Sequence, residues 1–286
     1  MTILVTGATG FIGQHVVEQL LATDGIRVIA TARTEPPAEK TAGLSKVEFV
    51  PFDIGADWGD TDLFTYFGKP DAVIHLAWPG LPDYKSLAHI DTYWLQHDRF
   101  LTNLITNGLT NLTVTGTCLE YGLQSGCLSE DLPTQPTTAY GIAKDNLRKA
   151  LELFIKNRTV SFKWVRLFYM FGKGQNPKSL LAQVEAAALR NEPVFNMSKG
   201  EQLRDYLPVT EVAKIIIQTS LQQRITGIIN CCSGQPISVR ALVERFMQEN
   251  HYILSLNPGY YPYPDYEPLA FWGDTRKLLN LLSNHD

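Results

Sequence analysis

The sequence Thr2-Ile-Leu-Val-Thr-Gly-Ala-Thr-Gly-Phe-Ile-Gly13, near the beginning of the chain, determines the fold that we predict. Its first apolar residues, Ile3–Val5, form a short run that is typical of a buried strand. Three glycines follow at a spacing of three residues, and apolar residues then recur at helical spacing over 16–21. The order strand, glycine-rich turn and helix predicts a βα unit.

The three glycines predict a site for a dinucleotide at this turn. Gly7 permits a sharp turn, Gly10 lets backbone N–H groups approach a pyrophosphate, and Gly13 lets the helix pack close to the strand. The N-terminus of the helix presents the positive end of its dipole to phosphates. A glycine-rich turn without a ligand is the alternative, and the flanking strand and helix make it the weaker one.

Strand-like and helix-like runs alternate over the first two-thirds of the chain. After the first strand, we expect strands at 27–30, 46–52, 72–76, 112–115, 160–168 and 227–231. The clearest helices are expected at 95–106, 138–156 and 211–222. This alternation predicts an α/β fold, a doubly wound parallel Rossmann sheet with right-handed crossovers.

Two stretches differ in composition from these elements. The first has glycine and proline around a helical pattern at 180–190, and the second combines a helix at 239–249 with an aromatic, proline-rich loop at 260–266. That loop is equally compatible with a surface coil and with a functional loop. The predicted division is 1–170 with 203–234 for the dinucleotide-binding Rossmann domain, and 171–202 with 235–286 for a small, discontinuous substrate-binding domain.

Composition limits the classes of partner. The 286 residues are 44% hydrophobic, the net charge is −4, and no basic run exists, which argues against nucleic acid and acidic membrane surfaces. No apolar stretch approaches the roughly 20 residues that span a bilayer. Because a strand is predicted from residue 2, we expect no signal peptide. The four cysteines form neither a disulfide framework nor a metal pattern, so we expect a cytoplasmic protein without a metal site.

Tyr140 and Lys144 are the candidate catalytic pair. They are four residues apart within a helical pattern, so both side chains lie on the same side of the helix. An ammonium near a phenol favours the phenolate, and we therefore expect the tyrosine pKa to fall from about 10 toward the working pH. Such a phenol exchanges a proton with a carbonyl or hydroxyl oxygen during hydride transfer.

The glycine spacing, the Tyr-x-x-x-Lys pair and the sequence Gly116-Thr-Cys-Leu-Glu-Tyr-Gly122 together resemble the extended short-chain dehydrogenase/reductase family, the NAD-dependent epimerases and dehydratases. The resemblance covers nearly the whole chain. It implies a catalytic triad of Thr117, Tyr140 and Lys144, in which the threonine hydroxyl holds the reacting oxygen near the phenol. It also implies a homodimer formed through a four-helix bundle.

The resemblance also implies where a pyridine nucleotide binds. Cofactor contacts are expected from Gly7, Thr9, Gly10, Phe11, Ile12, Gly13, Arg33, Asp53, Ile54, Leu76, Ala77, Trp78, Thr115, Tyr140 and Lys144. No acidic residue stands at the end of the second strand, where NAD-binding Rossmann folds place one; Arg33 stands there instead. A guanidinium suits a 2′-phosphate, which favours NADP (NADPH) over NAD. A solvated surface arginine is the alternative.

The resemblance implies a nucleotide-diphosphate sugar as substrate, with two departures from the family pattern. Dehydratases of the family carry an Asp-Glu pair after the catalytic threonine, whereas this chain has Cys118 and Leu119, which argues against loss of water. Tyr169 replaces the asparagine that meets the diphosphate. Arginine matches phosphate well, although Arg204 is as readily explained by an ion pair with a nearby carboxylate. Expected substrate contacts are Thr117, Cys118, Tyr140, Tyr169, Arg204 and Arg276.

The chain looks most like nucleotide-diphosphate-4-keto-6-deoxysugar reductases, which supply deoxysugars for polysaccharides or secondary metabolites. We therefore expect an NADPH-dependent reduction of the C4 ketone. A nucleotide-sugar 4-epimerase that retains its NAD(P) uses the same triad and remains open. A non-enzymatic NADP sensor is a further alternative, which the complete triad disfavours.

Overall fold

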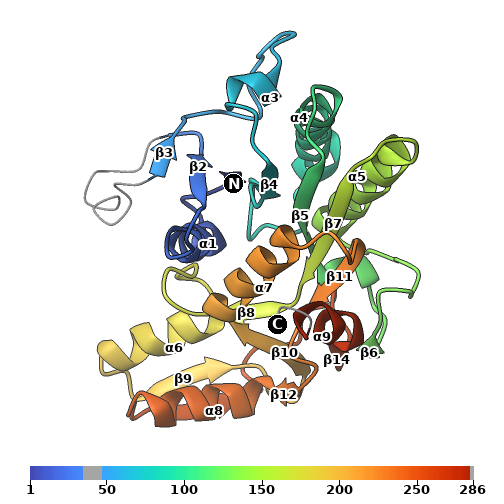
Figure 1. Ribbon diagram of the computed structural model, residues 1–286. Helices are drawn as coiled ribbons and strands as arrows, with labels where there is room; N and C mark the ends of the chain where they lie inside the picture. Colours follow the sequence, from blue (N-terminus) through green and yellow to red (C-terminus); the bar gives the residue numbers. More distant parts are fainter. Residues whose placement is uncertain (35–46, 284–286) are drawn as a thin grey trace.

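A computed structural model describes residues 1–34 and 47–283. Its centre is a seven-stranded sheet in the order β11-β7-β5-β4-β1-β2-β3, and every neighbouring pair is parallel (Figure 1). The strands are β1 (Thr2–Thr6), β2 (Arg27–Thr31), β3 (Val47–Phe49), β4 (Ala72–His75), β5 (Asn111–Thr117), β7 (Ser161–Leu167) and β11 (Gly227–Cys231). The predicted doubly wound sheet is confirmed.

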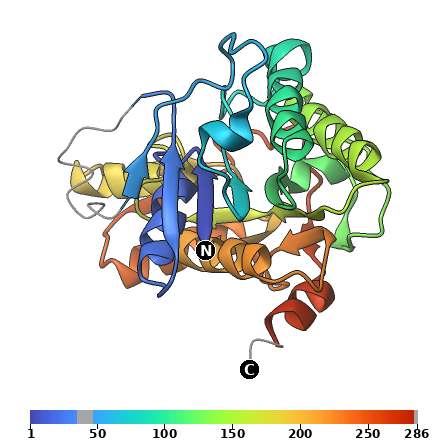
Figure 2. The same ribbon diagram turned by 45° about the horizontal axis from the view of Figure 1, so that its top comes forward.

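Helices cover both faces of this sheet. On one face lie α1 (Phe11–Leu21) and α7 (Val209–Leu221), which contact each other; on the other lie α3 (Leu63–Tyr66), α4 (Trp94–Thr106) and α5 (Ala139–Ile155) (Figures 1 and 2). Successive side chains of a strand point to opposite faces. In β1, Ile3 and Val5 therefore enter the core under α7, while Leu4 enters the core under α4.

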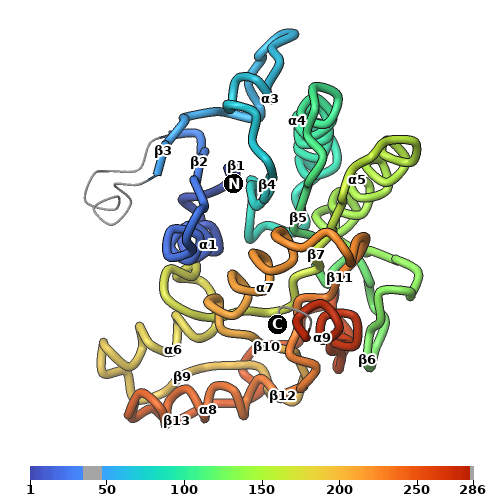
Figure 3. Tube along the Cα trace, viewed as in Figure 1, coloured from blue at the N-terminus to red at the C-terminus, as the bar shows by residue number. Residues whose placement is uncertain are grey.

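A smaller layer lies beyond one edge of the main sheet. It contains α6 (Leu180–Leu189), β9 (Val194–Met197), α8 (Val239–Glu249) and β13 (Ser255–Pro258), which share a separate apolar core. Figure 3 shows that α6 and α8, although distant in sequence, lie close together. A three-stranded sheet, made of β8 (Tyr169–Phe171), β10 (Leu203–Pro208) and β12 (Pro236–Ser238), lies between this layer and the main sheet.

The domain division made from composition stays a prediction. The second apolar core draws on both stretches assigned to the substrate-binding part. Several elements cross the proposed boundary. β8 spans the division at 170/171, and β10 falls in the range assigned to the Rossmann domain but pairs with β12. The sequence did not indicate β6 (Gly126–Leu128), which pairs with β14 (Phe271–Gly273), nor the π-helix His89–Tyr93, the 3-10 turn Cys118–Tyr121 and the last helix α9 (Arg276–Leu282).

The third predicted strand, 46–52, is shorter than expected: β3 spans Val47–Phe49, and residue 46 lies outside the described residues. Within the described residues, the structure contains no helix with the length and apolar character that crossing a bilayer requires.

Candidate active site

The turn between β1 and α1 has the geometry that the three glycines predict. Gly7 has φ +68°, and a Cβ there would lie 2.8 Å from the backbone nitrogen of Ala77. A Cβ on Gly13 would lie 2.2 Å from the carbonyl oxygen of Gly7, whereas one on Gly10 would meet only that oxygen, at 3.2 Å. No side chain caps the N-terminus of α1. The residues present therefore fit a dinucleotide phosphate at this helix end.

This turn opens into a cleft of about 840 Å³ at the carboxyl ends of the strands. Of the expected cofactor residues, those lining the cleft are Gly7, Gly10, Phe11, Ile12, Gly13, Leu76, Trp78, Thr115, Tyr140 and Lys144. Thr9, Arg33, Asp53, Ile54 and Ala77 are absent from the lining. Arg33 and Asp53 are exposed beyond the ends of β2 and β3. In parallel α/β sheets, ligands bind at this edge.

Thr117, Tyr140 and Lys144 meet in the middle of the cleft. Thr117 is the last residue of β5, and the other two lie in the first two turns of α5. The helix begins at this point because the Thr138 hydroxyl accepts the backbone N–H of Gly141 at 3.1 Å. All three catalytic candidates are buried.

The surroundings of Tyr140 and Lys144 fix their orientation. The Lys144 ammonium donates to the carbonyl oxygen of Thr115 at 2.9 Å and lies 3.9 Å from the ring centroid of Trp78. The ring of Tyr140 stacks on Tyr84, with centroids 5.6 Å apart, and the Tyr140 backbone N–H donates to the Tyr84 carbonyl at 3.0 Å. Sequence reasoning missed Tyr84, since nothing in the 80–85 segment indicates that it reaches α5.

The protonation states differ from the expectation made from the sequence. Burial raises the pKa of the Tyr140 phenol above its ordinary value, and a hydrogen bond with Thr117 opposes this only in part. Burial also lowers the pKa of Lys144 to about 7, which the negative charge of Glu120 partly offsets. The expected lowering of the tyrosine pKa by the lysine is therefore not found in the protein alone. The ammonium bonds to a backbone carbonyl, and the phenol is enclosed by rings.

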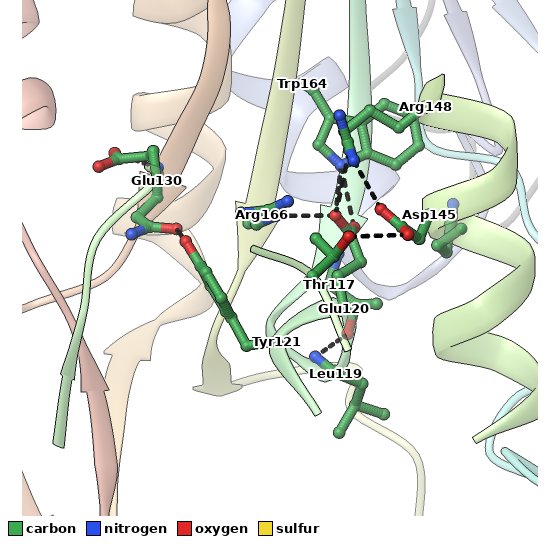
Figure 4. A network of polar contacts seen from close by, with 12 residues as sticks. Thr117, Leu119, Glu120, Tyr121, Glu130, Asp145, Arg148, Trp164 and Arg166 are labelled. Carbon is green, nitrogen blue, oxygen red and sulfur yellow. Dashed lines mark hydrogen bonds and ion pairs between the residues drawn. The ribbon is translucent and has the colours of Figure 1, made fainter. Parts of the chain in front are cut away.

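Glu120 is a further buried acidic residue beside Thr117 (Figure 4). Its carboxylate accepts the backbone N–H of Thr117 at 2.8 Å, the Trp164 indole N–H at 2.9 Å and the Arg166 Nε–H at 2.7 Å. Arg148 of α5 approaches it to 3.9 Å. The Gly-Thr-x-x-Glu pattern contains this residue, but nothing in the pattern indicates that its side chain turns inward.

The expected substrate residues fall into three groups. Thr117, Cys118, Tyr140 and Tyr169 line the cleft, and Arg204 lines an adjoining pocket of about 300 Å³. Arg276 lies outside both: its side chain is 85% exposed and pairs with Asp274.

A buried ion pair lies where the cleft meets the adjoining pocket. Both Nε and Nη2 of Arg204 donate to Glu267, at 3.2 and 2.9 Å, and Nη1 donates to the carbonyl oxygens of Leu203 and Leu269. The hydroxyl of Tyr169 donates to the other oxygen of Glu267. The arginine is thus engaged by protein groups, as the structural alternative held, although with a partner 63 residues away.

The two positions that follow Thr117 lack an acid–base pair. Burial raises the pKa of the Cys118 thiol well above its usual range, and Leu119 is buried and apolar. A thiol that keeps its proton is a poor base at neutral pH.

Two buried histidines lie behind the cofactor side of the cleft. The ring nitrogens His75 Nε2 and His97 Nδ1 share a hydrogen bond of 2.8 Å, and His75 Nδ1 contacts the Thr6 hydroxyl at 2.9 Å. Burial lowers the pKa of His97 to about 3 and that of His75 well below its usual value. His75 is thus packed within the fold.

Residues 3–232, most of the chain, match the NAD dependent epimerase/dehydratase family. The chain belongs to this family. It is 30% identical to dTDP-6-deoxy-L-talose 4-dehydrogenase (NAD(+)) of Aggregatibacter actinomycetemcomitans, over 96% of this chain and 99% of that protein. A second relative from the same bacterium, GDP-6-deoxy-D-talose 4-dehydrogenase, is 24% identical over 99% of this chain and 92% of its own length.

A solved structure shares the fold. The UDP-glucuronic acid 4-epimerase from Bacillus cereus, in complex with UDP-glucuronic acid and NAD, superimposes with a TM-score of 0.83. The alignment covers 99% of this chain and 93% of the epimerase, at 24% identity. The Rossmann architecture and the smaller layer beside it are therefore common to this group of proteins.

Proposed function

We propose that this family member interconverts the C4 ketone and C4 hydroxyl of a nucleotide-diphosphate-6-deoxyhexose by hydride transfer. The observation that carries the proposal is the cleft itself: Thr117, Tyr140 and Lys144 converge there, while Cys118 and Leu119 stand where a dehydratase needs an acid and a base. A relative matched from end to end is named as a 4-dehydrogenase of such a sugar. Oxidation and reduction at C4 are two directions of one reaction.

Thr117, Tyr140 and Lys144 each have a separate role in the proposed reaction. A bound nicotinamide coenzyme supplies or accepts the hydride. In the direction of reduction, the Thr117 hydroxyl holds the C4 oxygen, and Tyr140 donates its phenolic proton to that oxygen as negative charge develops. Because burial keeps the phenol protonated, Tyr140 is ready to act as the acid. Lys144 is fixed by the Thr115 carbonyl and, with its pKa lowered to about 7, carries a positive charge in about half of the molecules at neutral pH.

The coenzyme that we propose is NAD(H), rather than the NADPH expected from the sequence. The family is described as NAD dependent, and the 4-dehydrogenase relative carries NAD(+) in its name. Arg33 is exposed and absent from the lining of the cleft.

The test is to measure the dissociation constants of NADH and NADPH for the unmodified chain and for Arg33→Ala. Tighter binding of NADH in both supports NAD(H). A strong preference for NADPH that Arg33→Ala abolishes would restore the original expectation.

A 4-epimerase is the alternative function, because the structure that shares this fold is named as one and the triad serves both reactions. The two functions differ in what happens to the coenzyme. A 4-epimerase returns the hydride to the other face of the sugar, so it needs no added coenzyme and produces no net change in NADH.

The experiment is a panel assay. The chain is incubated with 4-keto-6-deoxy sugar nucleotides that carry different bases, with NADH or NADPH, and the absorbance of the reduced coenzyme is followed. We expect stoichiometric consumption of NADH, with a 6-deoxyhexose as the product identified by NMR. Epimerised sugar without coenzyme consumption would favour the alternative.

A further inference from the structure

The carboxylate of Glu120 closes the turn that carries the catalytic threonine. Glu120 accepts the backbone N–H of Thr117 at 2.8 Å, and the Thr117 hydroxyl accepts the backbone N–H of Leu119 at 3.3 Å. This reciprocal arrangement is a capping box, normally found at the start of a longer helix. Here it fixes the backbone from which the Thr117 hydroxyl extends into the cleft.

The same carboxylate is tied to two other elements that build the site. Trp164 and Arg166 of β7 donate to it at 2.9 and 2.7 Å, and Arg148 of α5 lies 3.9 Å away (Figure 4). Arg148 is held in turn by Asp145, at 2.7 Å. Because α5 also carries Tyr140 and Lys144, Glu120 connects the segment that bears the threonine with the helix that bears the other two catalytic candidates.

Gly116 supplies an independent observation. A Cβ at this position would lie 2.4 Å from the Glu120 Oε1 atom and 2.1 Å from the Trp164 Nε1 atom. The glycine is therefore required by the inward positions of the Trp164 indole and the Glu120 carboxylate rather than by backbone conformation. Gly116, Thr117 and Glu120 thus form one structural unit.

We propose that Glu120 is a positioning residue for Thr117, setting the place of its hydroxyl relative to the Tyr140 phenol. The proposal rests on the proposed function, because it assigns Thr117 the task of holding the C4 oxygen. A hydroxyl displaced by about 1 Å can cost a large part of the rate of the chemical step without weakening ground-state binding. An ion pair that only stabilises the core would instead affect the unfolding temperature and leave turnover intact.

The test compares Glu120→Gln with Asp145→Asn, a matched control that breaks a buried ion pair of Arg148 without touching the turn at Thr117. A glutamine amide cannot accept from Thr117, Trp164 and Arg166 at once, because its nitrogen would face a donor. For Glu120→Gln we expect kcat to fall by about tenfold or more, with KM and coenzyme affinity within about threefold. The kinetic isotope effect with 4-deuterated coenzyme should rise, while Asp145→Asn keeps normal values.

A double-mutant cycle separates an effect on the position of Thr117 from a loss of activity that does not involve Thr117. In a Thr117→Val background, adding Glu120→Gln should lower kcat by less than about twofold, since its target is already removed. A full further tenfold loss, or normal kcat in Glu120→Gln alone, would overturn the proposal. If Glu120→Gln fails to fold, Glu120→Asp keeps the charge but shortens the side chain, which withdraws the carboxylate from the Thr117 backbone N–H, and the same pattern is expected.

A measurement that needs no substrate separates a failure of the proposed function from a failure of the role proposed for Glu120. If the unmodified chain turns over no sugar of the panel, the proposed function fails, but crystal structures of the unmodified chain and the two variants still decide the second question. We expect the Thr117 hydroxyl to shift relative to Tyr140 in Glu120→Gln and to stay in place in Asp145→Asn. An unmoved hydroxyl in Glu120→Gln would contradict the proposal.

Discussion

Arg204 and Glu267 form a buried ion pair of 2.9 Å where the cleft meets the adjoining pocket. Breaking such a pair from one side leaves a buried charge without its partner, which costs about 3–5 kcal/mol. We therefore predict that Arg204→Met lowers the free energy of unfolding by this amount in urea titrations. The double variant Arg204→Met/Glu267→Gln should recover most of the loss. Equal stability of Arg204→Met and the unmodified chain would show that the pair is not formed in solution.

Tyr140 is the only proton donor that we assign to the reacting oxygen. Tyr140→Phe keeps the ring that stacks on Tyr84 but removes the hydroxyl. We expect kcat to fall by the roughly 10²- to 10⁴-fold that is typical of general acid catalysis, with coenzyme affinity nearly unchanged in fluorescence titrations. Turnover close to normal in this variant would refute the assignment.

The buried pair of His75 and His97 makes stability sensitive to acid. Both pKa values are lowered in the folded chain, that of His97 to about 3, so below the ordinary value of 6.5 the unfolded chain binds protons that the folded chain does not. The contribution of the two histidines to the free energy of unfolding is therefore fully present above pH 6.5. It decreases as the pH falls, by about 1.4 kcal/mol per pH unit for each group.

The measurement is the free energy of unfolding between pH 6.5 and 4.5. His97→Gln should remove about half of the contribution of the pair to this slope, because one of its two groups no longer titrates. His251→Asn replaces an exposed histidine and serves as the control. An identical slope in His97→Gln and the unmodified chain would contradict the burial of uncharged His97.

The predicted homodimer would form through α4 and α5, which pack side by side. Leu95 on α4 is 50% exposed and Leu153 on α5 is 75% exposed, and a two-fold contact needs only one apolar patch. We expect light scattering at micromolar concentration to give about twice the chain mass of 32.0 kDa. Leu153→Lys should shift the protein toward monomer, while Leu189→Lys, at an exposed site on α6, should not. A single species near 32.0 kDa for the unmodified chain would refute the dimer.

Local patterns were sufficient to predict the central sheet. The glycine turn, the buried strands and the helix of Tyr140 follow from periodicity and residue type. The bounds agree closely for β11 at Gly227–Cys231, whereas β3 is shorter than predicted. The short strands β6 and β14 could not be predicted, because each has three residues and pairs with a segment far away in the sequence.

Contacts between residues that are distant in the sequence also limited what could be predicted of the site. Thr117, Tyr140 and Lys144 belong to local motifs, and the structure brings all three to one cleft. Glu267 meets Arg204 only through the tertiary fold, across a sequence separation of 63 residues. The pKa of Tyr140 depends on rings brought in from elsewhere, so its direction could not be derived from helical spacing alone.

The most direct test of hydride transfer at C4 uses coenzyme carrying deuterium at C4 of the nicotinamide. The unmodified chain is incubated with a nucleotide-diphosphate-4-keto-6-deoxyhexose and the labelled NADH, and the sugar is examined by NMR and mass spectrometry. We predict one deuterium at C4 of the sugar for each coenzyme oxidised. Product without deuterium at C4, or labelled coenzyme left unoxidised while the sugar is converted, would contradict the account.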